Sequence, residues 1–320
     1  CSVIDNRTME KIVNKIQENS LLILAGDIHQ IEAIEFGNWF YYAKNIILTK
    51  GANVELSNTW RTDDPKLIDL WKEVREHKPL ITERMAIDGP FSEKIGAELL
   101  KEDEYKDHVV LCLNYDGKFG LNNMNNYFQC ANKEGEAVVW GEWTYKKGDP
   151  VLFNDSKRFP ALYNNLKGWI VDVEKDRKEI RFTIDIDMKL TEKECKENGI
   201  EFIGDTGKYT RIRFCVFKYD SNVPDDKVDE MRMKAVVPFQ LAYAVSIHKA
   251  QGLEYDSVKI VIPDSNSERV THGVFYTAIT RAKKKLKIYW SAETMKSIVD
   301  KFSKEEMGKR SLEIIKEKLS

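Results

Sequence analysis

The sequence predicts an α/β fold, a parallel sheet with helices on both faces that is interrupted by an inserted antiparallel unit. Residues 21–25 and 109–113 are continuous apolar runs, which are typical of strands buried on both faces of a parallel sheet. Residues 138–236 instead alternate apolar and polar side chains, as antiparallel strands with one solvated face do. The helix-rich pattern returns afterwards, so the α/β domain is expected to be discontinuous around the insertion.

The composition indicates real apolar cores and no general affinity for polyanions. Hydrophobic residues make up 42% of the sequence, which is enough for apolar cores. The length of 320 residues is enough for two domains or for one with a large insertion. The formal net charge is -2, so a nucleic-acid partner has to bind a local patch and not an overall basic field.

The cysteines and histidines predict neither a disulfide framework nor a metal site. The five cysteines form no close pairs and their number is odd, and the five histidines are scattered singly. No apolar run approaches the length of a membrane-spanning helix, and the N-terminus lacks the pattern of a signal peptide. A reducing cytoplasm is therefore the expected compartment.

The first stretch combines a helix with a strand that ends in polar residues. Apolar side chains at helical spacing predict an amphipathic helix over residues 8–17. The apolar run 21–25 then ends in Gly26-Asp27-Ile28-His29-Gln30. Taken alone, this ending is equally well a strand-terminating turn with a surface Gln or a ligand-facing Gln30.

The next unit begins at residues 45–49 and leads to Trp60 and Arg61. Asp64 and Pro65 then form an N-cap and first-turn pair for an amphipathic helix. Taken alone, the pair Trp60-Arg61 is an ordinary surface arginine beside a core tryptophan.

Two further segments carry polar candidates. The asparagine-rich residues 114–128 predict a polar helix face in preference to a nucleic-acid contact; the asparagines concerned are Asn122, Asn123, Asn125 and Asn126. Within the antiparallel unit, four basic and aromatic residues suit phosphate contact and base stacking, or equally a solvated loop; they are Lys157, Arg158, Phe159 and Tyr163.

Residues 241–290 hold the strongest candidates for a site. An apolar run stops at a polar cluster, whose members are Ser246, His248, Gly252 and Glu254. An amphipathic helix begins near residue 275 and places Thr280, Arg281 and Lys283 near its end. Each block is followed by a short β-rich run, and polar residues at strand ends are where open α/β sheets present ligand sites.

The last part of the chain is expected to be helical. Residues 283–285 are three lysines, interpreted as the solvated start of a strand. Residues 291–320 carry one apolar stripe and many charges, which predicts a packing helix with a solvated face.

Residues 242–255 and 275–283 resemble motifs V and VI of superfamily 1 helicases, in the RecD-like and Pif1-like branch. The strand that ends in Gly26-Asp27 and Gln30 resembles motif III, although Ile31-Glu32 stands where many relatives have Leu-Pro. Asn58, Trp60 and Arg61 resemble motif IV.

The resemblance also suggests how the chain is divided. Residues 1–6 resemble the tail of motif II, so its Asp-Glu pair is expected just upstream of Cys1. Residues 147–151 and 163–168 resemble the start of the β-barrel inserted in the second RecA-like domain. The expected parts are the end of the first RecA-like domain, the second RecA-like domain in two segments, and the barrel between them; their ranges are 1–44, 45–137 with 237–320, and 138–236.

The resemblance implies roles for individual residues. Facing the nucleotide it implies Gln30 as the γ-phosphate sensor, Arg61 and Arg281 as guanidiniums on the γ-phosphate, Trp60 stacked on adenine, and Gly252 with Glu254 nearby. Near the bound strand it implies Ser246 and His248, and the barrel adds Lys157, Arg158 and Tyr163.

The function implied by the resemblance is an ATP-dependent DNA helicase. It implies ATP and Mg²⁺ as cofactors, 5′-to-3′ movement on single-stranded DNA or a forked duplex, and a monomer. The sequence contains no G-x-x-x-x-G-K-[ST] loop, so the 320 residues alone are expected to lack ATPase activity. Two alternatives stay open: a non-catalytic nucleic-acid-binding module of helicase ancestry, and an RNA helicase of the same superfamily.

Overall fold

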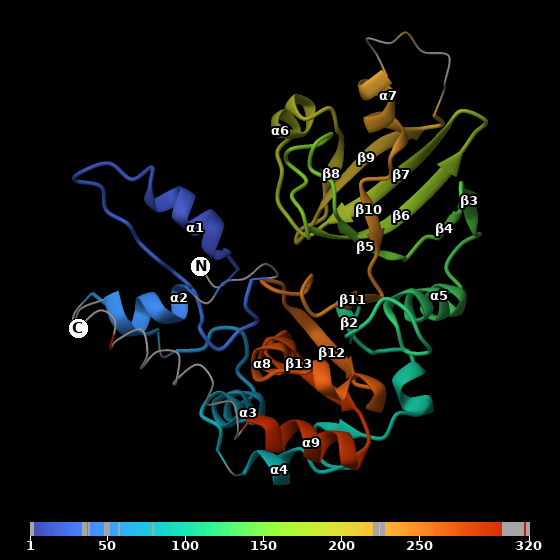
Figure 1. The fold of residues 1–320 in the computed structure, drawn as a ribbon. Helices are drawn as coiled ribbons and strands as arrows, with labels where there is room; N and C mark the ends of the chain where they lie inside the picture. The colour runs from blue at the N-terminus through green and yellow to red at the C-terminus, as the bar shows by residue number, and fades with distance from the viewer. Residues whose placement is uncertain are drawn as a thin grey trace. The chain divides into compact units, whose positions relative to one another are not determined.

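The computed structural model describes residues 3–33, 37, 39–47, 52–56, 58–78, 80–219, 224, 228–302 and 317. The chain divides into two compact units, which are described separately (Figure 1). The first unit is Cys1–Leu113 with Ser246–Ser320, and the second is Asn114–Val245. Predictions for residues 1–2 and 48–49, and for nearly all of 303–320, lie outside the described residues.

The first unit is built on a parallel sheet. Its strands, in the order β1-β13-β12-β2-β11, are Ser92–Glu93, Ala282–Tyr289, Tyr255–Val261, His108–Cys112 and Ala244–Ser246; the unit boundary falls within β11. In the central strand β12, Val258 pairs with Val109 on one side and Leu286 on the other, both in parallel register. The side chains of Val258 and Ile260 are fully buried, so the predicted parallel α/β architecture is confirmed.

The helices of the first unit follow the predicted apolar stripes where they pack. They are α1 Asn6–Val13, α2 Trp39–Tyr42, α3 Pro65–Arg75, α4 Ile81–Arg84, α8 His272–Ile279 and α9 Ala292–Phe302; a π-helix spans Ala43–Ile47, and short 3-10 helices span Ala97–Leu100 and Asp264–Arg269. The predicted start of α3 is confirmed, because the Asp64 carboxylate accepts a hydrogen bond from the Lys66 amide at 2.9 Å. Leu67, Leu70 and Val74 then bury one face of α3.

Two N-terminal predictions are wrong. Residues 21–25 form no strand, and Leu21 and Ile23 are 86% and 78% exposed. A strand buried on both faces needs neighbours on both edges, and the described residues provide no strand beside this segment. The first helix ends at Val13 and not at residue 17, because single turns replace the helical hydrogen bonds from Lys15 onward.

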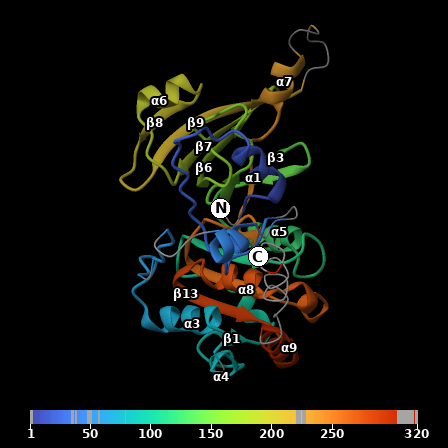
Figure 2. The same ribbon diagram turned by 60° about the vertical axis from the view of Figure 1, so that its left-hand side comes forward.

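The second unit contains one long helix and a six-stranded antiparallel sheet. Its helices are α5 Leu121–Ala131, α6 Glu192–Glu197 and α7 Val228–Ala235. The sheet order β10-β5-β6-β7-β9-β8 joins Phe239–Leu241, Pro150–Phe153, Lys167–Lys175, Glu179–Ile186, Thr210–Phe217 and Glu201–Asp205. A separate hairpin pairs β3 (Val138–Trp140) with β4 (Trp143–Tyr145). The helix α6 packs against β8 (Figures 1 and 2).

The antiparallel prediction is confirmed by the burial of the strands. Along β9, Ile212, Phe214 and Val216 are buried, while Arg213 and Cys215, which alternate with them, are half-buried. Gly168 allows close strand contact, since a Cβ there would lie 2.8 Å from Ile184 Cγ2. Among the described residues, the pairings run from β10 to β8 without joining these two edges into a closed barrel.

No helix in the described part of the chain combines the length and the apolar character that crossing a bilayer requires.

Candidate functional site

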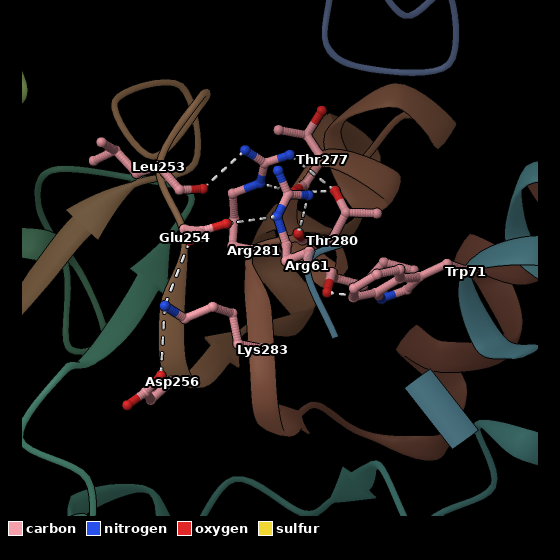
Figure 3. A network of polar contacts seen from close by, with 10 residues as sticks. Arg61, Trp71, Leu253, Glu254, Asp256, Thr277, Thr280, Arg281 and Lys283 are labelled. Atoms are coloured by element: carbon pink, nitrogen blue, oxygen red, sulfur yellow. Dashed lines mark hydrogen bonds and ion pairs between the residues drawn. The ribbon is translucent and has the colours of Figure 1, made fainter. Parts of the chain in front are cut away.

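The C-terminus of helix α8 is the centre of the candidate site. A helix leaves its last carbonyl groups without partners inside the helix, and here side chains from other segments satisfy them. The Trp71 indole donates to Ile279 O at 3.1 Å, and Arg61 Nη1 donates to Thr280 O at 2.6 Å. The sequence after the helix adds Arg281, whose Nε donates to Thr277 O at 2.8 Å (Figure 3). Cationic donors at this end also suit the helix dipole.

The two predicted guanidiniums therefore lie at one place. Figure 3 shows the side chains of Arg61 and Arg281 close together beside Thr280. Arg281 Nη2 donates to Thr280 Oγ1 at 3.0 Å, on the same residue whose carbonyl accepts from Arg61. Their common contact brings together two segments that are more than 200 residues apart in the sequence.

Arg281 is the more enclosed of the two. Its side chain is 1% exposed, and its Nη1 donates to Leu253 O at 3.0 Å. Burial, followed by repulsion from Arg61, lowers the pKa of the Arg281 guanidinium to about 10, so it stays charged at neutral pH. Its hydrogen-bond acceptors are carbonyl and hydroxyl oxygens, and among the described residues no carboxylate is in direct contact with it.

Glu254 contributes a carboxylate to the same network. Its Oε2 lies 3.3 Å from Arg61 Nε, and its Oε1 lies 3.4 Å from Lys283 Nζ. Burial alone would raise the pKa of Glu254, but Lys283 and Arg61 together hold it below its ordinary value. Lys283 lies in β13 and not at the end of a helix, so that part of the prediction is wrong: α8 stops at Ile279 because the turn at Thr280 leads directly into the strand.

Lys283 is also not simply solvated, as the sequence suggested. It is 24% exposed, and its Nζ lies 3.6 Å from Asp256 Oδ1. The other oxygen of Asp256, Oδ2, lies 3.1 Å from Lys284 Nζ. Glu254 and Arg281 precede β12 and β13, so the site lies at the amino ends of these strands. The general rule for open α/β sheets favours the carboxyl ends and would have predicted the opposite edge.

The loop that carries Gln30 docks on the same helix. The Ile31 amide donates to Thr277 Oγ1 at 2.8 Å, and Gln251 Nε2 donates to Ile31 O at 3.3 Å. Gly273 makes this approach possible, because a Cβ there would lie 3.0 Å from Gln30 O. The Gln30 side chain itself donates to Asp27 Oδ2 at 3.3 Å. Through the two bonds of Ile31, the segments that resemble motifs III, V and VI meet around α8.

Two predicted nucleotide-site residues have exposed or strained positions. Trp60 is 93% exposed, next to Arg61, and its ring is open to a planar ligand. Gly252 has a φ of +82°, which an L-residue adopts at a cost, while a Cβ there would meet no atom within 4 Å. Its requirement for glycine is therefore conformational.

Three of the five histidines cluster beside this loop, which sequence spacing did not reveal. The His77 ring stacks on His272 at a centroid distance of 4.2 Å, and His29 lies 6.1 Å from His272. His272 Nε2 contacts Val74 O at 2.8 Å. Burial lowers the pKa of His272 to about 4, so it is neutral at physiological pH.

The predicted strand-contact residues lie in both units. In the first, Ser246 Oγ accepts a bond from the Lys249 amide at 3.3 Å, within the turn that exposes His248. In the second, Lys157 is exposed and Tyr163 is 50% exposed. Arg158 differs, since its Nη atoms donate to Lys234 O and Cys215 O at 3.2 and 2.6 Å.

Arg158 and Phe159 therefore do structural work inside the second unit. Phe159 is 2% exposed, and the Arg158 guanidinium lies 4.6 Å from its ring centroid. Burial lowers the pKa of Arg158, as expected for a guanidinium that holds two backbone carbonyls. The prediction that Phe159 offers a stacking surface is wrong, because it belongs to the core around Phe214.

Two buried polar residues hold the chain before residue 246: sequence reasoning missed Asp149, and its prediction that Asn125 lies on a polar helix face is wrong. Asn125 exchanges two hydrogen bonds with the backbone of Ala244, at 2.9 and 3.0 Å. Asp149 is fully buried and accepts from Gln129, Asn132 and Tyr243 side chains at 2.6 to 2.9 Å. An isolated Asn or Asp carries no signal of such partners. Among the described residues, no group of three His, Cys, Asp or Glu is placed to hold a metal.

The first unit thus combines a parallel sheet with two guanidiniums and a carboxylate around the end of one helix. Residues 241–289 match the family of the UvrD-like helicase C-terminal domain. The match and the RecD relatives below confirm the resemblance of the chain to superfamily 1 helicases of the RecD-like and Pif1-like branch.

RecD proteins align with most of the chain. The RecBCD enzyme subunit RecD of Mycolicibacterium smegmatis is 20% identical, over 94% of this chain and 50% of that protein. RecD of Mycobacterium tuberculosis is 32% identical, over 64% of this chain and 28% of that protein. The chain spans between 28% and 52% of the length of the curated relatives it matches.

Solved structures of Pif1 helicases are also similar. Pif1 from Candida albicans aligns with a TM-score of 0.46 and 13% identity, over 87% of this chain and 66% of that one. Bacteroides Pif1 bound to ssDNA aligns with a TM-score of 0.45 and 15% identity, over 84% of this chain and 62% of that one.

Proposed function

We propose that the chain is part of an ATP-dependent DNA helicase that moves on single-stranded DNA from 5′ to 3′. Residues 45–137 and 237–320 would form its second RecA-like domain, residues 1–44 the end of the first, and residues 138–236 an inserted barrel. ATP would be hydrolysed between the two RecA-like domains. The RecD relatives support this proposal.

One observation carries the proposal: Arg61 and Arg281 share Thr280 as a hydrogen-bonding partner. Two guanidiniums repel each other, so the carbonyls that hold them leave a local excess of positive charge to which an anion is attracted. Guanidiniums stabilise the charge that develops on a phosphoryl group during transfer.

The residues present fit a nucleoside triphosphate. The polar network of Figure 3 includes three cationic side chains (Arg61, Arg281, Lys283) and two carboxylates (Glu254, Asp256), an excess of one positive charge. Arg61 is 28% exposed and can turn toward a phosphate, and the open Trp60 ring can stack on a base. Bound ATP with Mg²⁺ would supply the phosphoanhydride whose hydrolysis drives movement.

This chain's own groups would then have separate tasks. Arg61 binds and orients the γ-phosphate, Arg281 holds positive charge at a fixed place beside it, and Gln30 transmits the nucleotide state through its loop on α8. Because the loop, the α8 helix and the turn at Gln251 are hydrogen-bonded together, a shift at the nucleotide reaches Ser246 and His248 along a continuous path.

Single-stranded DNA is proposed to contact Ser246, His248, Lys157 and Tyr163. Exposed lysine suits phosphate and exposed tyrosine suits an unstacked base. Arg158 contributes indirectly, by fixing the loop between Lys157 and Tyr163. We further propose that the protein acts as a monomer in the cytoplasm, and that the 320 residues alone do not hydrolyse ATP.

The test uses the full-length protein. We expect ATP hydrolysis to rise at least about tenfold on adding a DNA oligonucleotide, and unwinding of forked duplexes only when the 5′ tail is single-stranded. Stronger stimulation by an RNA oligonucleotide would favour an RNA helicase. Binding of DNA without any ATP hydrolysis would contradict the proposal and favour a non-catalytic module.

A further inference from the structure

Lys283 is the residue of this network that the proposed nucleotide roles leave unexplained. Its Nζ lies 3.4 Å from one oxygen of Glu254, while Arg61 Nε lies 3.3 Å from the other (Figure 3). Two cations thus contact one carboxylate, each at a different oxygen. Asp256, 3.6 Å from Lys283, holds this lysine in place from a third direction.

The pairing of Arg61 with Glu254 opposes the role proposed for Arg61. A guanidinium that neutralises a carboxylate has to leave it before it can face a phosphate, and the carboxylate then loses a partner. Glu254 is 47% exposed, so water stabilises part of its charge, and a second cation close by reduces the cost of losing Arg61 further. Lys283 is 24% exposed and contacts both Glu254 and Asp256, which places it to be that cation.

We propose that Lys283 is a positioning residue for Arg61: it keeps Glu254 neutralised when Arg61 leaves, and so releases Arg61 toward the nucleotide. Glu254 acts as the resting partner of Arg61, in the place that phosphate oxygens take over. Lys283 weakens this resting pair, because two like charges compete for one carboxylate. This inference rests on the proposed function and adds a regulator of its phosphate-facing arginine.

The contacts of Arg61 make its release local. Its Nη1 donates to Thr280 O at 2.6 Å, a bond that does not involve Glu254. Rotation about the last side-chain bonds can exchange the carboxylate for a phosphate while the segment around residue 61 stays docked. Arg281 is buried and held by three protein oxygens, so it stays fixed.

The first experiment measures the release of Arg61 without nucleotide. Full-length protein is treated with phenylglyoxal, which modifies arginine, and the modification rate of Arg61 is followed by peptide mass spectrometry. We expect Glu254→Gln to raise this rate at least about threefold and Lys283→Gln to lower it about threefold. Lys284→Gln is the matched control, since Lys284 contacts Asp256 and not Glu254, and should change the rate by less than about 1.5-fold.

The second experiment follows ATP hydrolysis on single-stranded DNA. Lys283→Gln should lower kcat about tenfold with little change in KM, and Lys283→Arg should restore most of it because the charge is kept. In a Glu254→Gln background, Lys283→Gln should change kcat by less than about twofold, since no carboxylate is left to hold Arg61.

The outcomes separate this inference from the proposed function. Equal labelling of Arg61 in the Lys283→Gln and Lys284→Gln proteins would overturn it, as would equal loss of kcat in both Glu254 backgrounds, which indicates a merely structural lysine. A wild-type protein that hydrolyses no ATP would remove the proposed function, while the labelling result would still report whether Lys283 controls Arg61.

Discussion

Arg281 illustrates how a single residue can be both a structural and a functional group. Its side chain is buried and donates to Thr277 O and Thr280 Oγ1 at the end of α8 and to Leu253 O, yet it keeps a positive charge beside Arg61. The sequence predicted that Arg281 belongs to a site, but not which atoms it contacts there. Two of its three acceptors are backbone carbonyls, which carry no residue-type signal.

His272 gives a pH prediction at this scale. Its folded pKa is about 4 because of burial, against 6.5 as the ordinary value, so the unfolded chain takes up a proton in this window and the folded chain does not. Stability is therefore complete above pH 6.5 and falls as the pH drops toward 4, by up to about 3 kcal/mol.

The measurement is denaturant unfolding of the protein between pH 4.5 and 7.5. His272→Gln should flatten the slope of the unfolding free energy with pH, whereas His108→Gln, changed outside the three-histidine cluster, should keep it. An unchanged slope in His272→Gln would show that other groups cause the acid sensitivity.

At the scale of elements, α8 is the common support of the site. One end accepts hydrogen bonds from Trp71, Arg61 and Arg281, and its side receives the loop of Gln30 through Thr277. The helix, its flanking strands and the start of α3 were predictable, because apolar spacing and capping residues are local signals. The docking of the Gln30 loop was not, since it depends on contacts across 246 positions.

Thr277→Val tests this docking. The change keeps the shape of the side chain but removes the acceptor of the buried Ile31 amide, which should cost about 1–3 kcal/mol of stability. In the full-length protein it should also uncouple DNA from ATP hydrolysis, so that stimulation by DNA falls about tenfold while the basal rate changes little.

A matched control is Thr183→Val in β7, which removes a bond from Arg213 Nε to a buried threonine at 3.1 Å in the second unit. It should cost comparable stability and leave DNA stimulation intact. Equal loss of stimulation in both variants would mean that destabilisation alone is responsible.

At the scale of the whole molecule, the chain divides into two compact units, and the second runs from Asn114 to Val245. The predicted domain ranges stay predictions. The strand predicted at residues 21–25 does not form. A buried strand depends on neighbouring strands as well as on its own sequence, so this error concerns the arrangement of the whole unit. The second unit has its own core around Phe153, Phe182 and Phe214. Asp149 links that core to α5 and to Tyr243.

Asp149→Ala should strongly destabilise the second unit. It leaves the buried Tyr243 hydroxyl and one of the two Gln129 amide N–H groups without an acceptor, at an expected loss of about 3–5 kcal/mol in denaturant unfolding. Asp155→Ala removes only a local bond to the Lys157 amide and should cost less than about 1 kcal/mol. Similar losses in the two variants would contradict a central role for Asp149.

The most direct test of the shared phosphate site is single-turnover ATP hydrolysis by the full-length protein carrying Arg61→Lys, Arg281→Lys or both. Lysine keeps the charge but loses the planar fork, so each single change should slow hydrolysis at least about 100-fold with ATP still bound. The double change should be little worse than either one, because the two groups act together. Rates within about threefold of wild type, or two independent losses that multiply, would contradict one site served by both arginines.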